Sequence, residues 1–175
     1  MKIFRNVIII FIVIITILWG LSFLLSSKYT VERSIIIAAP VDSVFSYVSD
    51  LKKWKYWSPW LSVESDTSIN YSFSTSGDKT RMKWKSLKSG DGEVSIITTV
   101  PNQRITYSLK VEGFETHQRG EFLFGNFNGS TRVKWIDKGD LGPSPMSKYY
   151  IVVIENMIGS DFDRGLHNLK RAVEK

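Results

Sequence analysis

The sequence contains no cysteine and only two histidines among its 175 residues. Without cysteine, disulfide bonds, thiolate metal sites and a cysteine nucleophile are all excluded, and the redox compartment is left open. No G-x-S-x-G, H-E-x-x-H or phosphate-loop motif occurs either. The sequence therefore predicts no catalytic residue, no metal site and no cofactor.

The two histidines lack the partners that catalysis or metal binding requires. His167 lies in a polar stretch near the C-terminus and is expected to be solvated. His117 lies on an expected strand, and a bulge at Gly120 would leave its face undecided. Neither histidine has a pair of carboxylates at ligand spacing. Asp161 and Asp163 fall on different sides of the expected C-terminal helix and are interpreted as solvated charges.

The chain also lacks a strong excess of either positive or negative charge. The chain carries 23 basic and 17 acidic residues, and Lys2 and Arg5 precede the first hydrophobic stretch, so the remainder has a net charge of only +4. This scattered excess does not indicate nucleic-acid binding, although it permits attraction to anionic lipid. Arg81, Lys83 and Lys85 alternate along one expected strand. We interpret them as a solvent-facing row that protects the sheet, with a contact to lipid headgroups as the alternative.

One stretch lacks charge altogether. From Val7 to Leu25, 19 residues carry none, and as a helix they are about 28 Å long, close to the hydrocarbon thickness of a bilayer. A cleavable signal peptide is the alternative, but its apolar core is normally shorter and small residues follow it, for which Ser26-Ser27 is a weak candidate. The sequence predicts an uncleaved transmembrane anchor at residues 1–27 and a single domain at residues 28–175.

The charges that flank this stretch predict its orientation. Lys2 and Arg5 crowd the short leading tail, which favours a cytoplasmic N-terminus. Lys28 and Arg33 on the far side weaken the asymmetry. We expect a single-pass protein of the cell membrane with its domain outside the cytoplasm.

Beyond the anchor, hydrophobic periodicity predicts one strand, two short helices, about six more strands and one long helix. Pro40 precedes the first short helix, Asp50 caps the second, and Asn128-Gly129 marks a hairpin. The expected strands lie near 29–38, 69–73, 81–85, 94–100, 105–111, 122–124 and 132–135, and the expected helices near 40–49, 50–59 and 147–173. Such an order indicates an α+β fold in which a curved antiparallel sheet of about seven strands wraps around one long helix. This geometry tends to leave a cavity between sheet and helix.

Aromatic residues are abundant, with six Trp, seven Tyr and ten Phe. Those on apolar strand faces, on the helix stripe and in the W-K-Y-W-S-P-W segment are the candidate ligand-binding residues. For any one of them, ordinary core packing is the simpler interpretation, but as a group they suit an apolar cavity. The candidates are Trp57, Trp60, Trp84, Tyr107, Phe122, Phe124, Trp135 and Phe162.

Five stretches span nearly the whole domain: V-E-R-S-I-I-I-A-A-P-V-D-S-V-F-S-Y-V-S-D at 31–50, W-K-Y-W-S-P-W at 54–60, V-P-N-Q-R-I-T-Y at 100–107, G-S-T-R-V-K-W at 129–135 and D-F-D-R-G-L-H-N-L-K at 161–170. With this element order and these motifs, the chain resembles the START-like superfamily (SRPBCC, polyketide cyclase/dehydrase and lipid transport), in particular a bacterial subgroup with an N-terminal membrane helix. The resemblance implies a helix-grip fold and a pocket for a lipid-like or polycyclic ligand, but no particular reaction.

Three functional classes follow. The preferred one is a non-catalytic, membrane-tethered domain that binds a hydrophobic small molecule or lipid. The second is a cyclase/dehydrase-like enzyme, which needs two titratable groups converging in the cavity. The third is a structural or interaction domain with a filled core.

Overall fold

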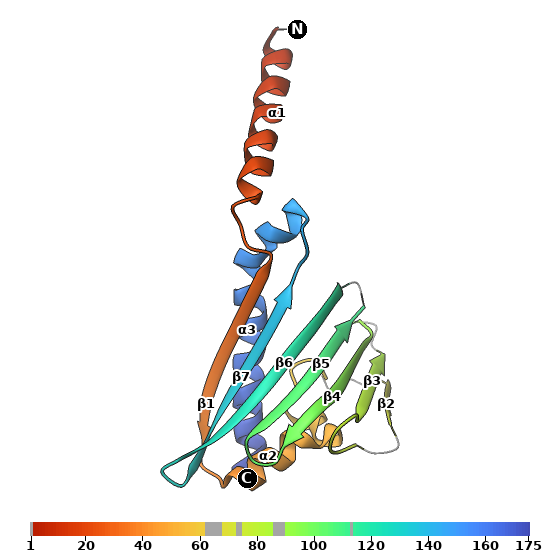
Figure 1. The fold of residues 1–175 in the computed structure, drawn as a ribbon, viewed down its shortest axis with the longest axis vertical. Coiled ribbons are helices and arrows are strands. Elements are labelled where there is room, and N and C mark those ends of the chain that lie inside the picture. The colour runs from red at the N-terminus through yellow and green to blue at the C-terminus, as the bar shows by residue number, and fades with distance from the viewer. Residues whose placement is uncertain (1, 62–67, 73–74, 86–89, 113) are drawn as a thin grey trace.

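One antiparallel sheet and one long helix beside it make up most of the domain in the computed structural model, which describes residues 2–61, 68–72, 75–85, 90–112 and 114–175 (Figure 1). The seven strands follow the order β1-β7-β6-β5-β4-β3-β2. This arrangement confirms the predicted helix-grip fold. The elements are α1 (Lys2–Ser22), β1 (Lys28–Ile37), α2 (Val41–Ser49), η1 (Leu51–Tyr56), β2 (Ser68–Tyr71), β3 (Arg81–Lys85), β4 (Gly92–Val100), β5 (Arg104–Val111), β6 (Phe114–Phe127), β7 (Ser130–Asp140) and α3 (Pro145–Val173).

The local signals in the sequence act where they were expected. Pro40 immediately precedes α2, and the Asp50 side chain accepts a hydrogen bond of 3.0 Å from the backbone N–H of Lys52 at the start of η1, a 3-10 helix. Asn128 and Gly129 both have positive φ angles, as a tight hairpin turn between β6 and β7 requires. The expected strand at 69–73 is observed as β2, and Phe73 lies outside the described residues.

The long helix α3 packs against the β1 side of the sheet (Figure 1). Its buried residues Ile154, Phe162, Leu166 and Leu169 lie on the predicted apolar stripe. Gly165 allows the helix to approach closely, since a Cβ atom there would lie 2.8 Å from the Trp135 ring. The glycine that weakens helix propensity is therefore the residue that lets helix and sheet meet.

Gly120 does not form the bulge that the sequence suggested. Its pairing with Tyr107 on β5 and with Asp137 on β7 lies within regular ladders. The irregularity between β5 and β6 falls instead between Leu109 and Val111. The side chain of His117, whose face depended on such a bulge, is outside the described part of the chain.

Most of the isolated charges have surface partners. Arg81 and Lys83 both contact Glu93 on the neighbouring strand, at 3.1 Å each, which favours the solvent-facing interpretation of this row. Asp163 pairs with Arg33 on β1, and Asp161 pairs with Arg164 three residues further along α3. His167 is exposed, as predicted, and its Nδ1 lies 2.7 Å from the carbonyl oxygen of Asp163.

The apolar N-terminal segment forms α1, which projects from the end of the domain where β1 begins (Figure 1). Within the described residues, the stretch Ile3–Ser22 is the one helix long and apolar enough to cross a membrane, and a signal sequence would meet the same criteria. Only residues 23–27 separate α1 from β1.

Candidate functional site

Six of the eight predicted ligand-binding residues come together in one aromatic cluster between the sheet and α3. Trp135 on β7 lies at its centre and stacks on Phe162 of α3 at a ring-centroid distance of 3.9 Å. Phe122 on β6 lies 4.7 Å from the Trp135 ring, and Trp57 and Trp60 lie 5.7 and 5.4 Å from it. The sixth member, Tyr107 on β5, lies 5.6 Å from Phe122. All six are buried except Trp60, which is half-buried.

The other two predicted residues lie apart from this cluster. Phe124 is buried against Phe45 of α2, at a ring-centroid distance of 5.3 Å. Trp84 is buried on β3, where its ring lies across Gly92 of β4. The indole Nε1 of Trp84 has no hydrogen-bond partner in the part of the chain that the structure describes.

A buried polar group adjoins the aromatic cluster on the side nearer α1. The Tyr29 hydroxyl on β1 donates a hydrogen bond of 3.2 Å to the carboxylate Oδ2 of Asp137 on β7. Tyr107 lies on β5, two strands from β7, and its hydroxyl accepts a hydrogen bond of 2.7 Å from Nε1 of Trp135. These four side chains are buried, so three hydroxyl or carboxyl groups converge on the inner face of the sheet.

Glycines on the neighbouring strands make this convergence possible. A Cβ atom at Gly120 would lie 2.0 Å from the Tyr107 ring, so that ring lies directly across β6 toward β7. In the same way the ring of Tyr29 lies across Gly139, where a Cβ atom would approach it to 2.5 Å. Both tyrosines therefore reach over a strand that presents no side chain of its own at that point.

Burial sets the protonation behaviour of this group. Removal from water raises the pKa of Asp137 from 3.8 to about 6, although the hydrogen bonds from the Tyr29 hydroxyl and the Lys138 backbone act in the opposite direction. Burial also raises the pKa of Tyr107 well above its usual value, and the nearby Asp137 charge adds to that effect. A carboxyl group with a pKa of about 6 is therefore hydrogen-bonded to one tyrosine hydroxyl and lies near a second.

Packing along α3 is uneven. In its C-terminal half Phe162, Leu166 and Leu169 are fully buried against the aromatic cluster and the short helices. Nearer its N-terminus Ile151 and Ile158 are only half-buried, although Ile154 between them is buried. The most completely buried part of α3 thus lies at the α2 end of the domain.

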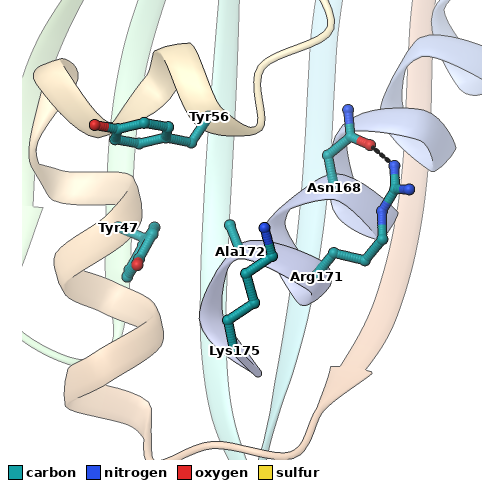
Figure 2. A pocket seen from close by; sticks show the side chains of 6 residues that line it. All are labelled: Tyr47, Tyr56, Asn168, Arg171, Ala172 and Lys175. Atoms are coloured by element: carbon teal, nitrogen blue, oxygen red, sulfur yellow. Dashed lines mark hydrogen bonds between the residues drawn. The ribbon is translucent and has the colours of Figure 1, made fainter.

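A separate hollow of about 490 Å³ lies on the surface between the short helices and the end of α3 (Figure 2). Tyr47 from α2 and Tyr56 from η1 face Arg171 and Lys175 across it, and Arg171 donates a hydrogen bond to Asn168. A neighbouring hollow of about 460 Å³ shares Tyr56 and Asn168 with it. Cationic side chains line both hollows: Arg171 and Lys175 the first, Lys55 and Arg164 the second.

Sequence reasoning missed Asp137 and Tyr29. The alternation of Val133 and Trp135 along β7, continued by two residues, places Asp137 on the inner face, so the signal was present. Trp54 belongs to the W-K-Y-W-S-P-W segment and is buried against Trp57 at 4.8 Å. Within the described residues, no group of three His, Cys, Asp or Glu side chains could hold a metal ion.

Comparison with known proteins agrees with this architecture. A family model described as polyketide cyclase/dehydrase and lipid transport matches residues 28–174. No curated protein matches the chain.

Several solved structures share the fold. Protein CV1439 from Chromobacterium violaceum has a TM-score of 0.62 at 14% identity, covering 83% of this chain and 97% of that one. A protein from Thermobifida fusca has a TM-score of 0.63 at 20% identity, covering 81% and 90%. DynU16, from the dynemicin biosynthetic locus, has a TM-score of 0.59 at 12% identity, covering 83% of this chain and 47% of its own. At these identities the likeness extends to the fold alone.

Proposed function

Because the chain belongs to the polyketide cyclase/dehydrase and lipid transport family, we propose that its domain, residues 28–175, binds a hydrophobic small molecule or lipid between the sheet and α3 without catalysing a reaction. The observation that carries this proposal is the uneven packing along α3. The aromatic cluster fills the α2 end of the interior, whereas Ile151 in the N-terminal half of α3 and Ile158 at its middle are only half-buried, with the buried Ile154 between them. An apolar ligand would complete the burial of this less covered half.

The eight predicted aromatic residues remain the proposed lining, and the fold gives them different positions relative to such a ligand. Tyr107 and Trp135 would form the floor of the site, with the hydroxyl of Tyr29 and the carboxyl of Asp137 beside them. A ligand with one polar group and an otherwise apolar body matches this combination. A free fatty acid or a hydroxylated polycyclic compound is of that class.

Ligand recovery tests the binding proposal. The full chain is purified in a mild detergent, and molecules that co-purify are identified by mass spectrometry. Ile154, buried on α3, is replaced by Trp to fill the proposed space, and the exposed neighbour Glu155 is replaced by Trp as the matched control. We expect stoichiometric ligand with the wild type and E155W but not with I154W. Recovery of no ligand from the wild type, in a folded protein, would favour the domain with a filled core instead.

One observation favours an enzyme as the second candidate. Asp137 and Tyr29 are hydrogen-bonded in the interior, and the pKa of Asp137 near 6 suits a general acid or base. If the domain is an enzyme, the Asp137→Asn variant should retain the unreacted substrate, whereas the wild type holds the product. The molecules recovered from the two proteins should then differ in mass. The same ligand in both proteins, with the same mass, would support a binding domain.

We further propose that α1 is an uncleaved anchor in the cell membrane, with a cytoplasmic N-terminus and the domain outside. The uncharged stretch from Val7 to Leu25, most of it in α1, is about 28 Å long as a helix and matches the hydrocarbon core. Lys2 and Arg5 precede this stretch and favour the proposed orientation. Removal of residues 1–25 should release the domain into the soluble fraction.

A reporter active only outside the cytoplasm, fused after Lys175, should be active, and replacing Lys2 and Arg5 by neutral residues should give mixed topologies. Activity confined to a cytoplasmic reporter would exclude the proposed orientation.

A further inference from the structure

The N-terminal half of α3 exposes a row of large apolar side chains that the core does not use. Met146, Tyr150, Val153 and Met157 are 70%, 57%, 48% and 58% exposed. Their spacing of four, three and four residues places them on one face of the helix. The core-facing residues of the same segment, such as Ile154, lie on a different face. We call these four residues the apolar row of α3. A contiguous exposed row of this kind is typical of an interaction surface.

The first turn of α3 is attached to the last turns of α1. The Lys148 amine donates a hydrogen bond of 3.1 Å to the backbone carbonyl of Ser22, at the C-terminal end of α1. The Tyr149 hydroxyl donates one to the carbonyl of Leu18, and the Lys148 amine also lies 5.8 Å above the Phe23 ring. The two helices consequently lie next to each other at one end of the domain (Figure 1). The start of α3 is therefore held at the same height as the end of α1.

The length of α1 places this junction relative to a bilayer. The uncharged stretch from Val7 to Leu25 is about 28 Å long as a helix, close to the thickness of a hydrocarbon core, and Lys2 and Arg5 precede it on the cytoplasmic side. Ser22 then lies near the outer hydrocarbon boundary and Leu18 about one helical turn deeper, so the first turn of α3 bonded to them also lies at this boundary. The nearby residues Trp19, Tyr149 and Lys148 are the types that anchor proteins at this boundary.

From this geometry we propose that the first turns of α3 dock on the lipid surface where α1 ends, with the apolar row inserted between phospholipid headgroups. The inference rests on the proposed membrane span of α1. Met157 lies eleven residues beyond Met146, about 16 Å further along the helix, so insertion decreases along the row. Met146 and Tyr150 are the deepest, Val153 lies among the headgroups, and Met157 lies at their outer edge. The domain is thereby fixed with the less covered end of its interior facing the membrane.

Spin labelling of the full chain tests this docking. Because the chain contains no cysteine, each single-cysteine variant carries one label, and the protein is placed in phosphatidylcholine/phosphatidylglycerol nanodiscs. Power saturation compares accessibility to dissolved oxygen, which partitions into lipid, with accessibility to an aqueous nickel complex. We expect labels at M146C and Y150C to be lipid-exposed, with that at M157C intermediate. The label at N156C, exposed on another face of α3, should be water-exposed.

A label at I10C, in the middle of α1, separates this proposal from the one it rests on. If I10C is lipid-exposed while M146C and Y150C are as water-exposed as N156C, the docking is wrong and the anchor stands. If I10C is itself water-exposed, the anchor is wrong and the docking falls with it. Dipolar broadening between labels at M146C in two copies of the chain would identify the row as a self-association surface and would also overturn lipid docking.

Discussion

The indole Nε1–H of Trp135 donates a hydrogen bond of 2.7 Å to the hydroxyl of Tyr107, and both side chains are buried. The two residues come from β7 and β5, which are separated by β6, and they meet because Gly120 leaves space between them. This pair joins the aromatic cluster to the polar group around Asp137. A hydrogen bond therefore links β5 and β7 across β6 in the interior.

The first prediction concerns this hydrogen bond. Tyr107→Phe leaves the buried Nε1 of Trp135 without an acceptor and should lower the free energy of unfolding by about 1–3 kcal/mol. Tyr56→Phe, at an exposed tyrosine, is the control and should change it by no more than about 0.5 kcal/mol. Urea titration of the full chain in detergent, followed by tryptophan fluorescence, measures both. Equal values for the two variants would mean that the bond contributes nothing measurable.

The second prediction concerns pH. In the folded protein the pKa of Asp137 is raised from 3.8 to about 6, so the folded state holds this proton more tightly than the unfolded state does. As the pH falls from about 6 to about 4, Asp137 should add up to about 3 kcal/mol of stability, which is absent above pH 6. Asp137→Asn should remove this contribution. The free energy of unfolding of the wild type should therefore rise relative to that of the variant as the pH falls.

Asp140 provides the control for this titration. The backbone N–H of Gly142 is the main cause of its lowered pKa. The stability that this group contributes is present at neutral pH and is lost in acid, the opposite sign to Asp137. As the pH falls from 7 to about 4, the difference for D137N should therefore change while that for D140N stays nearly constant, and below about pH 4 the difference for D140N should change in the opposite direction. A pH-independent difference for D137N would contradict a raised pKa.

Much of the fold could be predicted because its elements have strong local signals. The alternation along β3 and β5, Pro40 before α2 and the hairpin at Asn128-Gly129 each depend on residues close in sequence. The long stripe on α3 likewise required only helical periodicity. The seven-stranded antiparallel order follows once these elements are assigned.

The composition of the interior was harder to predict because it depends on contacts between distant strands. Asp137 was overlooked since an acidic residue is normally placed at the surface, whereas here a tyrosine 108 positions away accounts for its burial. Gly120 was interpreted as a bulge because glycine in a strand commonly marks one. That it accommodates an aromatic ring from β5 could be known only from the register of β5 and β6.

The third prediction tests that role of Gly120. Gly120→Ala would place Cβ 2.0 Å from the Tyr107 ring, and the displaced ring should also lose its bond to Trp135. We expect a loss of at least about 2 kcal/mol in the free energy of unfolding. Gly125→Ala on the same strand is the matched control, because nothing lies within 4 Å of a Cβ atom there. It should be neutral or slightly stabilising. Equal effects of the two substitutions would show that the ring relocates without cost.

The last prediction separates a ligand site from an ordinary core at Tyr107. If the tyrosine forms the floor of an apolar site, one side of its ring lacks protein contacts, so its truncation removes fewer of them than truncation in a packed core. A packed aromatic residue costs about 3–5 kcal/mol when replaced by Ala, and a packed leucine about 2–5 kcal/mol. Leu169, fully buried on α3, is the packed reference.

Comparing Tyr107→Ala with Tyr107→Phe removes the contribution of the hydroxyl, because both variants lack the acceptor for Trp135. We expect the free energies of unfolding of these two variants to differ by less than the loss that Leu169→Ala causes relative to the wild type. We also expect an apolar fluorescent probe to bind the wild type and Tyr107→Phe, but to bind Tyr107→Ala with altered affinity. If the difference equals or exceeds the Leu169→Ala cost and the wild type binds no probe, Tyr107 is a core residue. The domain would then act through its surfaces, because its interior would have no room for a ligand.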